Sequence, residues 1–84
     1  MCKKAYLINN IEEYGKLIAF CINKDVTVFR SYWDEREKGR RVYEINFNDK
    51  RLYYSDKRYY EDKGYLILNP VFEFNNFGDV VICN

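Results

Sequence analysis

The clearest pattern of apolar and polar positions lies between residues 10 and 25. Apolar side chains recur there at intervals of three and four residues, which is the period of an amphipathic helix. Asn10 precedes the first of them and Glu13 follows three residues later, an arrangement typical of a capped helix start. The pattern therefore predicts an amphipathic helix that begins after Asn10 and ends at residues 23–25. Its apolar stripe consists of Ile11, Tyr14, Leu17, Ile18, Cys21 and Ile22.

Phe20 departs from this stripe. At about 100° per residue it projects between Glu13 and Lys16, on the polar side of the helix. Two interpretations stay open for its ring: a loop or the C-terminal strand covers it, or it contacts a partner.

A period of two, typical of a strand with one buried face, marks residues 41–47. The positions on the apolar face are Tyr43, Ile45 and Phe47, and those on the other face are Val42, Glu44 and Asn46. Residues 48–50 have the composition of a tight turn, and residues 51–54 then return as the second strand. The segment therefore predicts an antiparallel hairpin.

Further short strands are expected where β-branched and aromatic residues gather. These segments are 4–8, 26–33, 65–68, 71–74 and 80–83. Ser55 is expected to cap a second short helix that runs through Lys63 and closes at Gly64. With 84 residues, the chain predicts a single α+β domain over residues 1–84. In this fold the N-terminal helix packs on a mainly antiparallel sheet of about four to six short strands, with the second helix near 55–63.

Charge and composition narrow the class of protein. Fourteen basic and thirteen acidic residues give a formal net charge of +1, whereas duplex DNA binders need a clear positive excess. DNA mimics need the opposite excess, so any electrostatic steering must come from local patches. The first apolar run, Ala5–Ile8, is too short for a signal peptide or a membrane span. We therefore expect a cytoplasmic protein without membrane contact, in which Cys2, Cys21 and Cys83 are free thiols.

The residues of common catalytic mechanisms are missing from the sequence. The chain has no histidine, and its four glycines are scattered at positions 15, 39, 64 and 78, so no phosphate-binding loop is present. The carboxylates lie in charged runs beside Lys and Arg, which is the composition of a solvated surface. A divalent-metal site from Asp34, Glu35 and Glu37 would be nonspecific. We expect no enzymatic activity, no cofactor and no metal.

Aromatic pairs beside charged runs are the candidates for binding. Tyr, Trp and Arg are enriched at protein–protein hot spots. The expected contact residues for a protein partner are Tyr32, Trp33, Asp34, Glu35, Glu37, Arg40, Arg41, Tyr59, Tyr60, Glu61 and Asp62. One tyrosine of each adjacent pair must point inward on a strand, and the sequence does not tell which one.

Two alternatives use the same aromatic residues. A module for single-stranded nucleic acid would stack bases on tyrosines and hold phosphates with Lys and Arg. Its residues would be Lys50, Arg51, Tyr53, Tyr54, Lys57, Arg58, Tyr59 and Tyr60. A protein partner is favoured, because the interspersed Asp and Glu would repel phosphates. In the other alternative, the surplus aromatic residues form the interface of a homodimer.

In general character the chain resembles the small inhibitors that phages and mobile elements carry against bacterial defence, including anti-CRISPR proteins. The resemblance rests on the small size, the missing catalytic groups, the aromatic and charged surface, and an AT-rich coding background. Alanine occurs only at positions 5 and 19, while Phe, Tyr, Ile, Asn and Lys are frequent. No motif is matched, and many anti-CRISPR proteins are acidic DNA mimics, which this chain is not. The resemblance implies a cytoplasmic inhibitor that occupies a protein surface of a host nuclease complex, such as a CRISPR effector.

Overall fold

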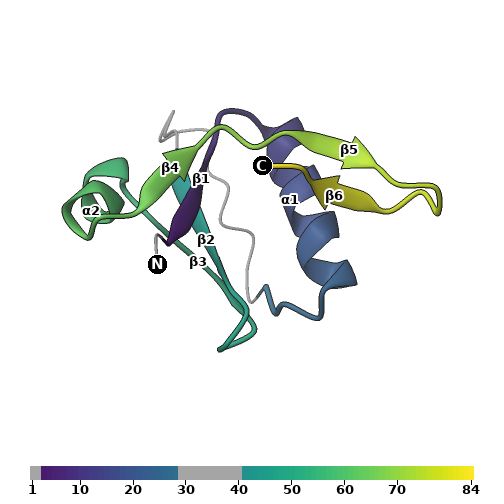
Figure 1. Cartoon of the computed structure of the whole chain (residues 1–84), viewed down its shortest axis with the longest axis horizontal. Coiled ribbons are helices and arrows are strands. Elements are labelled where there is room, and N and C mark those ends of the chain that lie inside the picture. Colours follow the sequence, from purple (N-terminus) through teal and green to yellow (C-terminus); the bar gives the residue numbers. More distant parts are fainter. Residues whose placement is uncertain (1–2, 29–40) are drawn as a thin grey trace.

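The computed structural model describes residues 3–28 and 41–84. Its elements in chain order are β1 (Lys4–Ile8), α1 (Ile11–Asn23), β2 (Arg41–Asn46), β3 (Arg51–Ser55), α2 (Lys57–Asp62), β4 (Leu66–Leu68), β5 (Phe72–Phe74) and β6 (Val80–Ile82) (Figure 1). The predicted α+β class, with a helix on a mainly antiparallel sheet and a second short helix, is confirmed. None of the helices in the described part of the chain is long and apolar enough to cross a membrane.

Two sheets are present among the described residues. The larger has the strand order β3-β2-β1-β4, and the smaller is the β5-β6 hairpin. β2 pairs antiparallel with β3, which is the predicted hairpin, and β1 pairs antiparallel with β2. β4 instead runs parallel to β1. Of the strand expected at 26–33, Thr27 forms only an isolated bridge with Arg51, and residues 29–33 lie outside the described ones.

Helices cover both faces of the four-stranded sheet, α1 on one side and α2 on the other (Figure 1). The core under α1 contains the buried residues Ile8, Tyr14, Leu17, Cys21, Val26, Tyr43 and Leu52. The core under α2 contains Ala5, Val42 and Tyr60. Val42 is therefore buried although the alternation placed it on the less apolar face, because α2 covers that face as well.

The start of α1 follows the predicted cap closely. The backbone N–H of Glu13 donates to Asn10 Oδ1 at 2.8 Å. The Glu13 carboxylate accepts from the backbone N–H of Asn9 at 3.2 Å, one residue before the usual partner. Ile11 and Ile22 are exposed, so the buried stripe is narrower than predicted.

Asn10→Ala should destabilise the protein by about 0.5–2 kcal/mol, because it leaves a donor of the first helical turn without its acceptor. The midpoint of urea unfolding measures this loss. Asn9→Ala is the matched control, since Asn9 contributes its backbone N–H to the cap. Equal losses in the two variants would contradict the assigned cap.

The second helix begins later than predicted. Ser55 pairs with Val42 as the last residue of β3, so it cannot also cap a helix. Asp56 occupies the cap position instead, without a side-chain cap bond. The end of the helix was predicted correctly: Gly64 has a positive φ of 78°, and its N–H donates to the Glu61 carbonyl at 3.0 Å.

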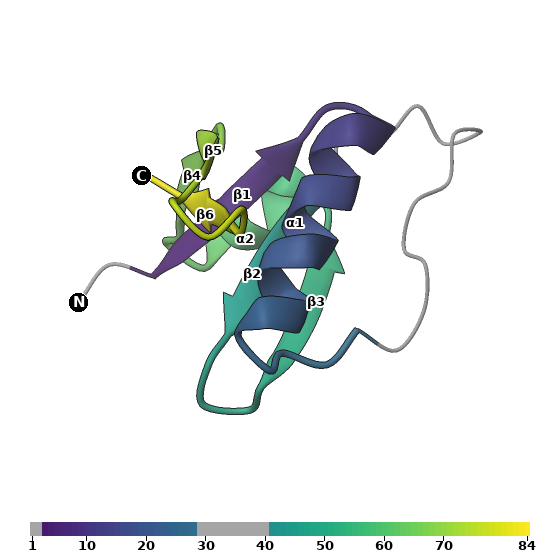
Figure 2. The same cartoon turned by 90° about the vertical axis from the view of Figure 1, so that its right-hand side faces the viewer.

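The β5-β6 hairpin lies across α1. Phe72 and Ile82 pack against the core under α1, and the turn end of the hairpin extends past the helix (Figure 1). Figure 2 shows the same helix lying along β2 and β3. Phe20 is half-buried and lines a cleft of about 290 Å³ with Ile82 of β6, so the C-terminal strand does lie beside it.

The buried thiol and phenols predict a loss of stability at alkaline pH. Burial raises the pKa of Cys21 from 9.0 to about 12 and raises the pKa of Tyr43 above 10.0. Unfolded chains ionise these groups at lower pH than the native protein does. Their contribution is therefore complete below about pH 9 and is lost as the pH rises towards 12, at about 1.4 kcal/mol per group and pH unit. The urea midpoint of unfolding should decrease as the pH is raised from about 8 to about 11, and it should recover when the pH is lowered again. A midpoint that stays constant over this range would contradict the prediction.

Candidate functional site

Most residues of the charged loop that was expected to contact a protein lie outside the described residues. These are Tyr32, Trp33, Asp34, Glu35, Glu37 and Arg40. Arg41 is described as the first residue of β2, and its guanidinium carbon lies 4.6 Å from the centroid of the Tyr54 ring. Arg41 thus contacts the protein's own aromatic surface.

The adjacent tyrosines of α2 have opposite roles. Tyr60 is 1% exposed and packs with Ala5 and Val42, so a partner does not reach its ring and it drops out of the predicted contact set. Tyr59 is 48% exposed and remains available. Glu61 and Asp62 are exposed, in agreement with their predicted surface position.

The tyrosines of β3 lie on opposite faces of the sheet, as neighbours on a strand must. Tyr54 is paired with Tyr43 on the face under α1, and their ring centroids are 5.9 Å apart. Tyr53 is paired with Glu44 on the α2 face. The four tyrosines expected to bind nucleic acid therefore do not share one surface: Tyr54 lies on the α1 face, and Tyr60 is buried. The expected cations Lys50, Arg51, Lys57 and Arg58 are exposed.

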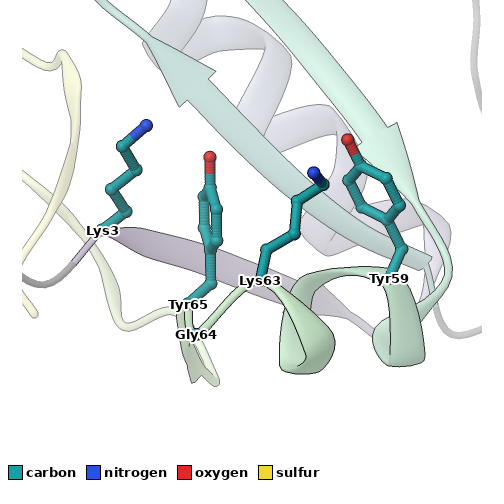
Figure 3. Close-up of a pocket in the computed structure, with 5 residues that line it drawn as sticks. All are labelled: Lys3, Tyr59, Lys63, Gly64 and Tyr65. Atoms are coloured by element: carbon teal, nitrogen blue, oxygen red, sulfur yellow. The ribbon is translucent and has the colours of Figure 1, made fainter.

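The structure instead builds a groove from residues of separate segments, which we call the lysine–tyrosine groove. It has a volume of about 600 Å³ and is lined by Lys3, Tyr59, Lys63, Gly64 and Tyr65 (Figure 3). The ammonium groups of the lysines and the hydroxyls of the tyrosines point to the same side, and the two residue types alternate along the groove. None of the described residues that line it is acidic.

Buried Tyr60 fixes the two tyrosine rings of this groove. The Tyr59 ring meets it edge-on at 5.1 Å between centroids, with an interplanar angle of 90°. The centroid of the Tyr65 ring lies 4.9 Å from that of Tyr60, and the angle between the two ring planes is 65°. Lys63 Nζ lies 5.1 Å from the Tyr59 centroid and Lys3 Nζ lies 5.8 Å from the Tyr65 centroid. Each of these rings therefore has a lysine ammonium group over its face.

A second, adjoining groove of about 360 Å³ shares Lys3, Tyr59 and Tyr65 with the first and is also lined by the acidic residues Glu44 and Asp49. The Tyr65 hydroxyl donates to Glu44 Oε2 at 2.8 Å, and the Tyr53 hydroxyl donates to Asp49 Oδ2 at 2.9 Å. Burial, and then the bond to Glu44, raise the pKa of Tyr65 to about 12. The Tyr65 hydroxyl therefore stays protonated at neutral pH and keeps Glu44 as its acceptor.

Sequence reasoning missed Lys3, Lys63 and Tyr65. Lys3 reaches the groove because β1 and β4 are parallel, and its carbonyl accepts from the Leu66 N–H at 2.8 Å. This contact joins segments about sixty positions apart, which no local pattern shows. The available signal was Gly64, since a helix that stops there must turn the next aromatic residue back towards the sheet.

An exposed apolar surface lies on the β5-β6 hairpin, and we call it the hairpin surface. Under this name we group exposed side chains of the hairpin segment, namely the apolar Val71, Phe74 and Phe77 and the acidic Glu73 and Asp79. Phe74 is 67% exposed and Phe77 is 89% exposed. Residues 71–84 contain these two acidic residues and neither Lys nor Arg.

The turn that carries Phe77 is held by hydrogen bonds. Asn75 Oδ1 accepts from the backbone N–H groups of Phe77 at 2.9 Å and Asp79 at 3.0 Å. The Asn75 N–H donates to the Asp79 carbonyl at 2.9 Å, and Gly78 supplies the positive φ of 79° that closes the turn. Phe77 is therefore displayed by an ordered turn.

The described residues contain no group of three or more His, Cys, Asp and Glu side chains placed to hold a metal ion. Cys21 is buried and its raised pKa keeps the thiol protonated, so it behaves as a small apolar side chain. Cys83 is an exposed free thiol whose pKa is also raised, by desolvation and by Glu73. Comparison with protein-family models, with curated protein sequences and with solved structures finds no match to this chain.

Proposed function

We propose that the protein is a non-catalytic protein-binding module that contacts its partner through the hairpin surface. The observation that supports this most strongly is Phe77, 89% exposed on a turn held by Asn75, with Phe74, 67% exposed, at the end of β5 in the same hairpin. Two mostly exposed phenylalanines offer apolar area that binding to a partner would remove from water. The hydrogen-bonded turn is also preorganised for binding, because little backbone entropy of the turn remains to be lost.

The charge around these rings supports a basic partner surface. Along the chain Glu73 precedes Phe74 and Asp79 follows Phe77, and residues 71–84 contain no Lys or Arg. A partner with Lys or Arg around an apolar pocket would be complementary to this arrangement. Asp34, Glu35 and Glu37 remain further proposed contacts of the same sign.

A nuclease complex has such a surface where it grips nucleic acid. We therefore extend the proposal to a phage or mobile-element inhibitor of a bacterial nuclease complex, of the anti-CRISPR type. It acts in the bacterial cytoplasm by occupying a protein surface. Binding at the nucleic-acid channel of the nuclease would exclude the substrate without any chemistry by the inhibitor.

Affinity capture with the tagged protein from bacterial lysate, with and without nuclease digestion, tests this proposal. The expected result is a defined protein complex that survives digestion, is released by excess untagged protein, and loses nuclease activity when the protein is added back. If the captured protein is no longer recovered after nuclease digestion, the proposal of a protein partner is overturned. Sedimentation at micromolar concentration is the companion measurement, because a dimer that hides Phe77 would turn the same surface into a self-interface.

A further inference from the structure

We propose that the lysine–tyrosine groove is a second binding site, and that it holds a single-stranded nucleic acid. The groove lies on the α2 side of the four-stranded sheet, whereas the hairpin surface belongs to the β5-β6 hairpin that packs with α1. The two sites therefore use different residues and can be tested separately.

The tyrosines of the groove suit base stacking. Tyr59 is half-exposed, and Tyr60 holds both its ring and the Tyr65 ring edge-on. Single-strand binding sites place such fixed aromatic faces beside cations that follow the phosphates. The lysine ammonium groups lie within 6 Å of these rings. As flexible side chains, both can turn from ring to phosphate when a base stacks.

Part of the objection that the sequence raised against nucleic acid does not apply to the groove. Glu61 and Asp62 interrupt the basic residues along the chain, yet neither lines the groove. Lys3, brought in by the parallel β1/β4 pair, adds a positive charge that the sequence pattern did not include. Glu44 accepts the hydrogen bond of the Tyr65 hydroxyl, which lies between the two lysines (Figure 3), so phosphates would contact each ammonium group on the side away from Glu44.

Alternation of cations and rings distinguishes this ligand from an acidic peptide. Carboxylates would pair with Lys3 and Lys63 but would leave the faces of Tyr59 and Tyr65 without planar partners. A single strand presents a phosphate and a planar base at each step, so it uses both kinds of group.

Fluorescence anisotropy with a labelled oligothymidylate of about ten nucleotides tests the proposal. Each phosphate contact contributes about 0.7 to the slope of log affinity against log salt on single strands. Two lysines therefore predict a slope near −1.4, which is about a sevenfold loss between about 50 and 200 mM salt. Absence of binding at the lower salt concentration would overturn the proposal.

Matched variants assign the binding to this groove. Lys3→Gln with Lys63→Gln should abolish most of the salt dependence. Lys50→Gln with Lys57→Gln removes the same charge from exposed positions outside the groove and should leave the slope unchanged. Equal effects of the two pairs would show a general charge effect and overturn the proposal.

A third variant tests stacking. Tyr59→Ala should weaken binding at least about fivefold with an unchanged salt slope, because it removes a ring and no charge. Displacement of the oligonucleotide by polyglutamate of equal length and concentration would contradict stacking. Phe74→Ala with Phe77→Ala should leave oligonucleotide binding intact, so failure at one site is distinguishable from failure at the other.

Discussion

Replacing Phe74 and Phe77 together by alanine is expected to weaken binding of the captured partner at least about thirtyfold. A single aromatic hot spot contributes about 2 kcal/mol or more, and each 1.4 kcal/mol is a tenfold change in Kd. Both rings are mostly exposed, so their loss removes little of the protein's own packing. The fold and the urea midpoint should therefore remain close to those of the unmodified protein.

Phe47→Ala is the matched control for this experiment. Phe47 is 57% exposed, follows β2, and lies outside the hairpin surface. Calorimetric titration of the purified partner with each variant should show the loss for the double variant and nearly unchanged affinity for Phe47→Ala. A similar loss in both would indicate nonspecific apolar adhesion, and no loss in the double variant would place the contact elsewhere.

Local signals account for the elements that the sequence predicted well. Asn10 caps α1 because its side chain meets a backbone donor three residues away. Alternation along residues 41–47 and the turn composition of residues 48–50 predicted the β2-β3 hairpin, although Phe47 lies after β2 and is exposed. Gly64 ends α2 because only a positive φ turns the chain there. Each of these features is determined by residues that lie within a few positions of one another along the chain.

The failures have long-range causes. Ser55 has the residue type of a helix cap, but its pairing with Val42 across the ladder determines its conformation. Val42 alternates with the apolar positions, yet α2 buries it. The groove was missed because Lys3 and Tyr65 meet through the parallel β1/β4 pair. The exposure of Phe77 depends on how far the hairpin extends past α1. The sequence of β5 and β6 alone does not specify this, because it depends on how the hairpin packs on the helix.

Tyr60 belongs to the core between α2 and the sheet and also contacts the tyrosine rings of the groove, so its truncation should affect both. It is buried under α2, and it supports the rings of both Tyr59 and Tyr65. Truncating a buried aromatic side chain costs about 3–5 kcal/mol, against a total stability of about 5–15 kcal/mol for a domain of ordinary size. Tyr60→Ala should therefore leave a marginally folded protein with a strongly reduced urea midpoint.

Tyr60→Phe and Tyr59→Ala separate the two roles of this residue. Phe keeps the ring, so the free energy of unfolding should change by less than about 1.5 kcal/mol, as for other volume-conserving exchanges. Tyr59→Ala removes an edge-on partner and should cost about 0.5–1.5 kcal/mol. Chemical unfolding followed by circular dichroism measures all three variants. If Tyr60→Ala were no more destabilising than Tyr59→Ala, the sheet would not have a second core under α2, and the groove would lack the support that orients its rings.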